Sequence, residues 1–142
     1  MRALLDVNVL IALNDEGHVH HLSASSWLAQ HMHFGWASCP LTQNGMLRIM
    51  SQPSYGNAQE LSVLFEKLRN ETSQSAHAFW PDDISLLDEA FIDANKLLSP
   101  RQLTDAYLLA LAVKHGGRLI TLDKRIPLNS VKGAKAMHLV SL

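Results

Sequence analysis

The chain alternates short apolar runs with longer segments in which apolar residues recur every three or four positions. Short runs of this kind predict buried strands, and the recurrence predicts amphipathic helices. We expect strands at Arg2–Leu5, GWASCP (35–40), HAFWP (77–81), RLITLD (118–123) and AMHLVSL (136–142). Short apolar strands that alternate with helices favour a parallel sheet covered on both faces.

The segments between these strands predict helices. In the first half of the chain we expect them over Val7–Leu13, over His20–Met32, from an N-cap at Thr42 to Met50, and over Ala58–Arg69. Further along, Asp82 or Asp83 can cap a helix that carries Ile84, Leu87, Phe91, Ala94 and Leu98 on one face. Thr104 can cap DAYLLALAVKH (105–115), which Gly116 and Gly117 end and which is apolar nearly all round. This last helix should therefore be buried.

Length and composition describe an ordinary globular chain. Its 142 residues predict one domain, residues 1–142, and 47% hydrophobic with 18% charged residues argues against disorder. The single cysteine, Cys39, cannot form an internal disulfide, which favours a reducing, cytoplasmic location. We expect neither a signal peptide nor a membrane span. The net charge of −1 gives no support to a nucleic-acid partner, so any such binding must come from a local site.

Three aspartates fall where a parallel sheet collects ligands. Asp6 and Asp123 follow predicted strands, and ligands of open parallel sheets bind at the carboxyl ends of the strands. Asp105 lies in the first turn of the buried helix before the Asp123 strand, and topology alone leaves its distance from the other two open. Converging carboxylates need a cation or raised pKa values. Oxygen ligands suit Mg²⁺ or Mn²⁺, which can activate water for phosphodiester hydrolysis.

Each acid also has an ordinary structural explanation. Asp6 can be the N-cap of the following helix, Asp105 a first-turn acid favoured by the helix dipole, and Asp123 a turn former. The placement of all three acids at strand ends or a helix start shifts the balance modestly towards a site.

Three blocks of sequence resemble PIN-domain nucleases, and most closely the VapC-type toxins of bacterial toxin–antitoxin pairs. These are LLDVNVLIAL (4–13), CPLTQNGMLRIMSQP (39–53) and LTDAYLLALAVKHGGRLITLDKR (103–125). The resemblance covers nearly the whole chain. It implies a three-layer α/β/α sandwich with a central, mainly parallel sheet, and a Mg²⁺- or Mn²⁺-dependent endoribonuclease.

Carried over by motif, the resemblance makes Asp6, Asp105 and Asp123 the metal-site acids. Asn8 matches a small polar residue that orients the first acid, and Thr121 a hydroxyl kept near the site. The sequence departs from many PIN domains because Gln43, Asn44 and Gly45 stand where a further acid, usually Glu, is common. A subset of VapC-like sequences shares this amide-bearing version. An amide brings no charge, so we expect one firmly held metal rather than two.

Arg48 lies one helical turn beyond Asn44 and either contacts the scissile phosphate or pairs with a site acid; a surface arginine is the equally weighted alternative. The resemblance further implies an RNA substrate, with tRNA and rRNA as the first to test, and an antitoxin that covers the site with a basic side chain. It also implies a homodimer, for which the exposed part of the first helices is a candidate surface.

Two other functions compete with this interpretation. DVNV (6–9) approaches the D-x-D-x-[VT] motif of haloacid-dehalogenase-like phosphatases, with Asp6 as nucleophile, but Asn8 replaces the general acid and cannot transfer its proton. Alternatively, the chain is a degenerate PIN module that binds RNA or a protein without cleavage. The missing fourth acid favours that alternative, and the three retained acids speak against it.

Overall fold

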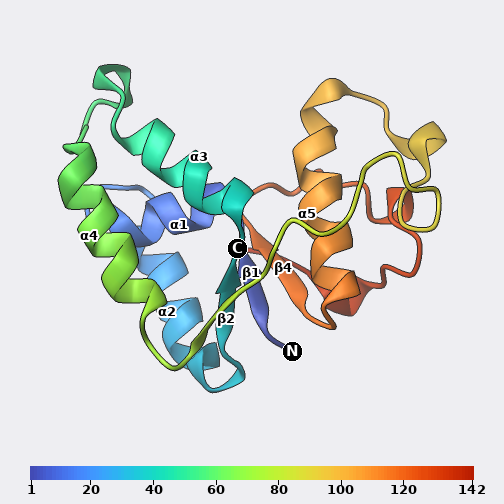
Figure 1. The fold of residues 1–142 in the computed structure, drawn as a ribbon, viewed down its shortest axis with the longest axis horizontal. Coiled ribbons are helices and arrows are strands. Elements are labelled where there is room, and N and C mark those ends of the chain that lie inside the picture. Colours follow the sequence, from blue (N-terminus) through green and yellow to red (C-terminus); the bar gives the residue numbers. More distant parts are fainter.

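The central layer is a sheet of five parallel strands, seen in a computed structural model that describes residues 1–142 (Figure 1). The strands are β1 (Ala3–Leu5), β2 (Trp36–Ser38), β3 (His77–Phe79), β4 (Arg118–Thr121) and β5 (Leu139–Ser141). They lie in the order β3-β2-β1-β4-β5, and every pairing is parallel. Each strand falls within a predicted stretch, so the five strand predictions are confirmed.

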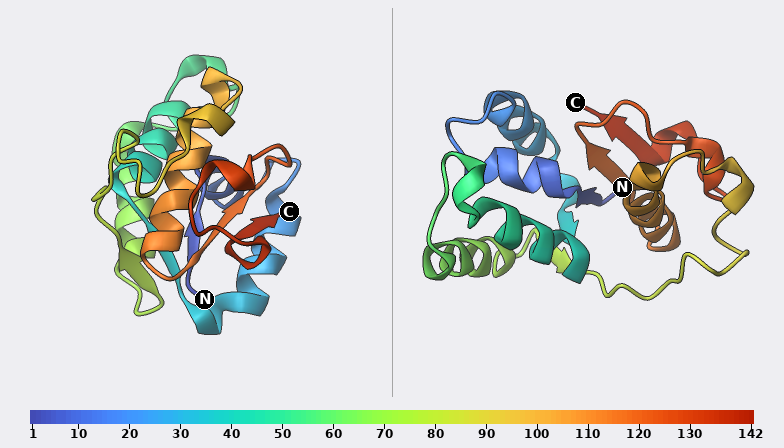
Figure 2. Two further views of the ribbon diagram at one scale, coloured as in Figure 1. Left: turned by 90° about the vertical axis from the view of Figure 1, so that its right-hand side faces the viewer. Right: turned by 90° about the horizontal axis from the view of Figure 1, so that it is seen from above.

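Helices cover both faces of this sheet, as Figures 1 and 2 show. They are α1 (Val7–Asn14), α2 (His21–His31), α3 (Pro40–Met50), α4 (Leu61–Thr72) and α5 (Leu103–Lys114). Successive residues of a strand point to opposite faces. Ala3 and Leu5 accordingly pack with α1 to α4, whereas Leu4 packs with α5. The predicted three-layer α/β/α sandwich is confirmed. No helix has the length and apolar character needed to cross a membrane.

Two helices begin earlier than predicted. Helix α3 starts at Pro40, because proline needs no hydrogen bond for its nitrogen at the first helical position. Thr42 lies in the first turn, where its hydroxyl accepts a hydrogen bond from the Cys39 backbone N–H at 3.0 Å. Helix α5 starts at Leu103 after a 3₁₀ turn, Pro100–Gln102, so Thr104 is a helical residue and not the cap.

The helix expected after Asp82 and Asp83 does not form, and that prediction is wrong. Residues 81–99 run as turns and extended chain with one 3₁₀ turn at Ala94–Lys96. Their backbone pairs instead with the segment before β5: the Asp93 N–H donates to the Ser130 carbonyl at 2.8 Å, and the Lys132 N–H donates to the Phe91 carbonyl at 2.8 Å. These tertiary hydrogen bonds override the local helical periodicity.

The strand order reverses between β1 and β4, and this is the place where the fold builds a site. The chain leaves β1 towards β2 and β3 on one side, whereas β4 and β5 lie on the other. Gly116 and Gly117 lie in the turn that connects helix α5 to β4. A Cβ at Gly117 would lie 2.5 Å from the Arg2 carbonyl oxygen, so only glycine fits this turn. Because the turn is short, α5 runs antiparallel to β4, and its first turn lies at the carboxyl edge of the sheet.

Candidate active site

Asp6 lies immediately after β1 and is 5% exposed. Its backbone N–H pairs with the Ile120 carbonyl at 3.0 Å, and its side chain is the N-cap of α1. One carboxylate oxygen accepts the Val7 N–H at 2.7 Å, and the other accepts the Thr121 hydroxyl at 2.8 Å. Burial raises the pKa of Asp6 above its ordinary value, although both hydrogen bonds oppose this shift. The carboxylate is therefore held in one position at a cost in solvation.

Thr121, the last residue of β4, connects two of the acids. It is fully buried, and its hydroxyl donates to Asp6 while accepting the Asp123 backbone N–H at 3.0 Å. Asp123 itself lies two residues beyond the strand, where one carboxylate oxygen accepts the Arg125 N–H at 2.8 Å. Thr121 thus fixes the Asp6 carboxylate and the start of the Asp123 turn together.

Asp105 lies in the first turn of α5 and completes the group of acids. Burial raises its pKa to about 6, and the negative charges of Asp6 and Asp123 add to the shift. This mutual repulsion means that α5 brings Asp105 within electrostatic reach of both strand-end acids. The structure therefore brings together the three aspartates predicted from the sequence, including the one whose position topology left open.

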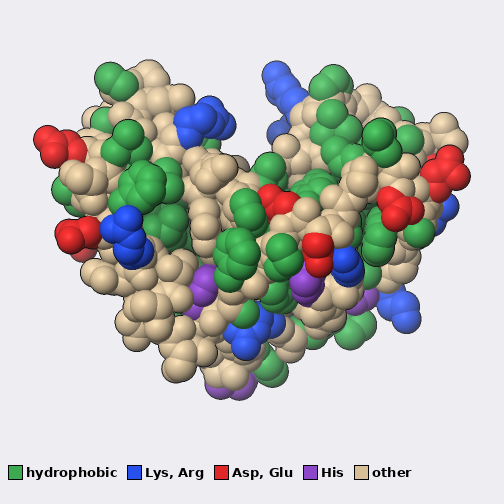
Figure 3. All heavy atoms as spheres, viewed as in Figure 1, with side chains coloured by type: hydrophobic (Ala, Val, Ile, Leu, Met, Phe, Trp, Pro, Cys, Tyr) green, Lys and Arg blue, Asp and Glu red, His purple; other side chains and the backbone are tan.

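Two of the acids, Asp6 and Asp105, lie along a groove of about 380 Å³ between α1, α3 and α5. Asp6 and Asp105 line it together with Asn8, Asn44, Arg48 and Thr104. Asn8 makes no side-chain hydrogen bond to Asp6, and the group that orients this acid is the Thr121 hydroxyl. Asn44 and Arg48 share one exposed face of α3, as their spacing of one turn requires. Figure 3 shows the resulting cleft, with acidic side chains at its base and Lys or Arg side chains on both rims.

Gln43 does not belong to this groove. Its amide donates to the Ser38 hydroxyl at 2.9 Å, and this hydroxyl is also 2.8 Å from His77 Nε2. Gln43 lies between α3 and α4, because successive residues of a helix point about 100° apart. A supporting role of Gln43 at the acids therefore disagrees with its position, and Asn44 is the amide that faces them.

A second pocket of about 110 Å³ adjoins the groove at Asp105 and contains Arg101, a basic residue that the sequence alone did not single out. Asp105 and Asp123 form its acidic side, and Arg101 and Arg125 line it together with Ser99 and Gln102. Arg125 is mostly exposed and makes a loose ion pair with Asp123, with Nε and Oδ1 3.6 Å apart. Arg101 makes no ion pair. The sequence signal was weak, since an arginine four residues before an aspartate has many ordinary explanations.

The donor set suits a hard divalent cation. The structure brings no three His, Cys, Asp or Glu side chains close enough together to hold a metal ion between them. Mg²⁺ is usually held by one or two carboxylates and keeps several waters, so an open group of acids is the arrangement it prefers. Burial raises the pKa of Asp105, and the charges of Asp6 and Asp123 add to the shift, which a bound cation would oppose. Asp6, Asp105 and Asp123 are therefore the candidate ligands of a magnesium or manganese ion.

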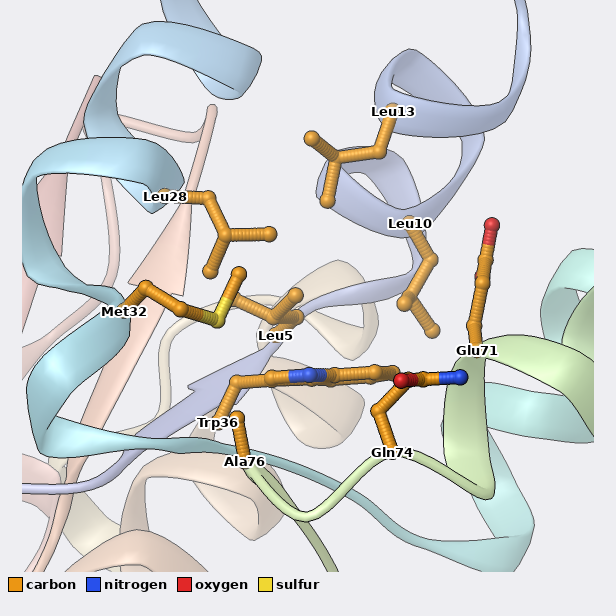
Figure 4. Close-up of a pocket in the computed structure, with 9 residues that line it drawn as sticks. All are labelled: Leu5, Leu10, Leu13, Leu28, Met32, Trp36, Glu71, Gln74 and Ala76. Carbon is orange, nitrogen blue, oxygen red and sulfur yellow. The ribbon is translucent and has the colours of Figure 1, made fainter.

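An apolar pocket of about 260 Å³ opens on the other side of α1 and offers no comparable chemistry (Figure 4). Side chains of β1, α1, α2 and β2 form its walls, among them Leu5, Leu28 and Trp36. Glu71 and Gln74 are its polar residues and lie at one side in Figure 4. Without convergent acids or basic groups, this pocket is no candidate for phosphodiester chemistry.

The raised pKa of Asp105, caused first by burial and then by the charges of Asp6 and Asp123, predicts a pH-dependent stability in metal-free protein. Because its pKa is about 6 in the fold and near 4 when unfolded, the native state binds the extra proton, and stability falls as pH rises from 4 to 6. Asp105→Asn removes this loss. In EDTA at pH 8 we expect the variant to be more stable by about 1–2 kcal/mol after allowance for solvent screening, and equally stable at pH 4.

Urea unfolding of both proteins at the two pH values measures this difference. Added Mg²⁺ should then stabilise the wild type and not the variant, because a ligand that binds only the native state raises its stability. A variant less stable than the wild type at pH 8 in EDTA would contradict like-charge repulsion at this position.

Comparison with known proteins places the chain in a family. The model of the PIN domain matches residues 3–132. Ribonuclease VapC44 of Mycobacterium tuberculosis is 49% identical over 142 residues, which is all of both chains. Ribonuclease VapC39 of the same organism is 43% identical over 124 residues, 87% of this chain and 89% of its own, and Ribonuclease VapC38 is 40% identical over 126 residues, 85% and 84% respectively. The chain belongs to the PIN-domain family and, within it, to the VapC proteins.

Proposed function

We propose that this protein is a Mg²⁺- or Mn²⁺-dependent endoribonuclease and the toxin of a toxin–antitoxin pair. The observation that carries the proposal is the group formed by Asp6, Asp105 and Asp123 at the switch in strand order, where burial and the charges of its two neighbours raise the pKa of Asp105. The family membership supports the same reaction, because its relatives are named ribonucleases. It also removes the phosphatase alternative, which belongs to another family.

In this proposal the three aspartates hold the metal, and a bound Mg²⁺ or Mn²⁺ supplies Lewis-acid activation of the phosphodiester and of the attacking water. The chain provides the rest. Thr121 keeps the Asp6 carboxylate in place through its hydrogen bond. Arg48 lines the groove beside Asp6 and Asp105 and offers a charge to the scissile phosphate. Asn44, one turn earlier on α3, donates to the same phosphate or to a water near it.

The charge pattern of the groove supports an RNA substrate despite the net charge of −1. Three acids alone would repel a polyanion, so a metal and nearby arginines are both needed for phosphate to approach. Arg48 supplies such a charge on the α3 side. RNA binding by this site is then local and dependent on divalent metal, as expected for a chain without an overall basic surface.

The negative charge of the groove also indicates what kind of partner would inhibit the protein. A cognate antitoxin that inserts a lysine or arginine among the aspartates would neutralise them and displace the metal. A homodimer remains a prediction from the family resemblance. We expect purified toxin to lose metal-dependent cleavage when its antitoxin is added in equimolar amount.

Cleavage of total tRNA and rRNA by antitoxin-free protein tests the function directly. The reaction is run with Mg²⁺, with Mn²⁺ and with EDTA, and the Asp105→Asn variant controls for contaminating nucleases. We expect discrete, metal-dependent cuts that the variant does not make. A well-folded protein that binds these RNAs without cutting them under any condition would instead support a non-cleaving PIN module.

The amide at position 44 predicts how many metal ions the free protein holds. With Asn44 in place of a fourth carboxylate, the site has the three carboxylates of Asp6, Asp105 and Asp123, enough for one tightly bound cation and too few for a second. Titration calorimetry with Mn²⁺ should show one site per chain. The Asn44→Glu variant should gain a second site, and two full sites in the wild type would contradict the prediction.

A further inference from the structure

We infer that Arg101 is a substrate-positioning residue that binds an RNA phosphate next to the scissile one, on the opposite side of Asp105 from Arg48. The inference rests on the proposed ribonuclease function and specifies how the same site holds its substrate. It starts from the two adjoining pockets, which share Asp105 and differ in the basic residues that border them.

Arg101 combines an unpaired charge with a position beside the acids. Several basic side chains are already engaged: Arg2 donates to two carbonyls, Lys67 to the Asn14 carbonyl, and Lys114 pairs with Asp83. Other lysines are also unpaired, but none of them lines a pocket with the aspartates. Arg118 lies against the rings of Trp27 and Phe34. Arg101 forms no ion pair even though two carboxylates, Asp105 and Asp123, line its pocket. An unpaired guanidinium that lies beside carboxylates without pairing with them is available to bind another anion.

The backbone that carries Arg101 is fixed in place. Pro100 restricts the 3₁₀ turn, and the Arg101 N–H donates to the Ser99 hydroxyl at 3.3 Å. The Gln102 side-chain oxygen accepts a hydrogen bond from the Leu98 N–H at 2.8 Å, which ties the residues before the turn to its last residue. This turn leads directly into α5, so the position of Arg101 is coupled to that of Asp105 at the start of the helix. A guanidinium on such a support loses less backbone entropy on binding than one on a flexible loop.

The two arginines then define a path for the RNA strand. Arg48 borders the groove on the α3 side and Arg101 borders the second pocket on the α5 side, with Asp105 common to both. A strand that places its scissile phosphate over the acids and beside Arg48 has a neighbouring phosphate towards Arg101. Guanidinium groups bind phosphate oxygens in pairs, which suits this task. Arg101 therefore governs substrate binding and register and leaves the bond-breaking step to the acids.

The test compares Arg101→Gln with Arg69→Gln, a matched loss of one exposed arginine on α4. Arg69 lies over the Phe65 ring and away from the acids. On an RNA that the wild type cuts once, we expect Arg101→Gln to raise KM about three- to tenfold with kcat nearly unchanged. The salt dependence of log kcat/KM should become shallower by about 0.7, the value for one phosphate of a single strand. Arg69→Gln should match the wild type in all three quantities.

Shortening the RNA distinguishes a phosphate contact from a general structural effect. Removal of the nucleotides on the side of the cut that faces Arg101 should abolish the effect of Arg101→Gln, and removal on the other side should preserve it. The effect of Arg48→Gln, at the scissile phosphate, should persist in both shortened RNAs. Equal KM and salt dependence in Arg101→Gln and the wild type would overturn the inference. So would a loss confined to kcat, which would assign Arg101 to the reacting phosphate.

Failure of the ribonuclease function itself would look different, because the wild type would then cut no RNA. Binding separates the two cases, since fluorescence anisotropy with a labelled single-stranded RNA in Mg²⁺ needs no cleavage. Compared with the wild type in this assay, Arg101→Gln should weaken binding by the same three- to tenfold factor. Equal binding by the two proteins would also overturn the inference.

Discussion

Asp6→Asn should abolish metal-dependent cleavage while leaving the fold intact. The asparagine is nearly isosteric, and its side-chain oxygen can still accept the Val7 N–H that caps α1. The lost negative charge belongs to the most buried of the three acids, so nothing else in the groove can replace it as a metal ligand. Removal of groups that merely support metal ligands costs about 10–100-fold, and loss of a ligand should exceed about 100-fold in kcat/KM.

Stability provides the control for this substitution. Burial raises the pKa of Asp6, so a neutral side chain at this position should leave the free energy of unfolding unchanged or increase it. Cleavage is measured with the mapped RNA at saturating Mg²⁺, and unfolding with urea in EDTA. Full activity in a folded Asp6→Asn protein would remove Asp6 from the metal site and with it the proposed mechanism.

Thr121→Val should lower kcat by about 10–100-fold, although Thr121 touches neither the metal nor the RNA in the proposed mechanism. Valine keeps the branched shape that a buried strand position favours, but it removes the hydroxyl between Asp6 and the Asp123 backbone. The Asp6 carboxylate then loses one of the two hydrogen bonds that oppose its raised pKa, so that pKa rises further. Metal binding should weaken and shift to higher pH, since the ligand must be ionised.

Thr121→Ser is the matched variant, because it keeps the hydroxyl and removes only a methyl group. Serine should restore most of the activity and the wild-type pH dependence of Mn²⁺ affinity. If valine and serine reduce cleavage equally, packing of the methyl group rather than the hydrogen bond explains the effect. Titration calorimetry with Mn²⁺ between pH 5.5 and 8 measures the shift independently of cleavage.

Much of the site could be predicted because two of its acids follow strands of a parallel sheet. Predicting the positions of Asp6 and Asp123 required only the strand assignments and the rule that ligands gather at carboxyl ends. Predicting the position of Asp105 also required the direction of α5. The pair Gly116 and Gly117 contained that information, since so short a turn forces the helix to run back antiparallel to β4.

Other parts of the molecule depend on tertiary contacts that no local pattern reveals. The periodic residues from Ile84 to Leu98 predict a helix, yet Leu87 and Leu98 are about nine-tenths exposed and the backbone pairs with the segment before β5. Gln43 and Asn44 are neighbours with similar chemistry, and only the packing of α3 decides which one faces the acids. Arg101 likewise gains meaning only from the shape of its pocket.

The hydrogen bond between Thr121 and Asp6 joins residues 115 positions apart, and this has a consequence for synthesis of the protein. A ribosome that has translated the chain as far as α5 has produced Asp6 and Arg48 but no Thr121 or Asp123. The site also depends on β5 and the residue after it, because Ser141 and Leu142 hydrogen-bond to the backbone at Asp123 and Thr121. A nascent chain thus lacks the proposed nuclease site until β4 and β5 have been synthesised.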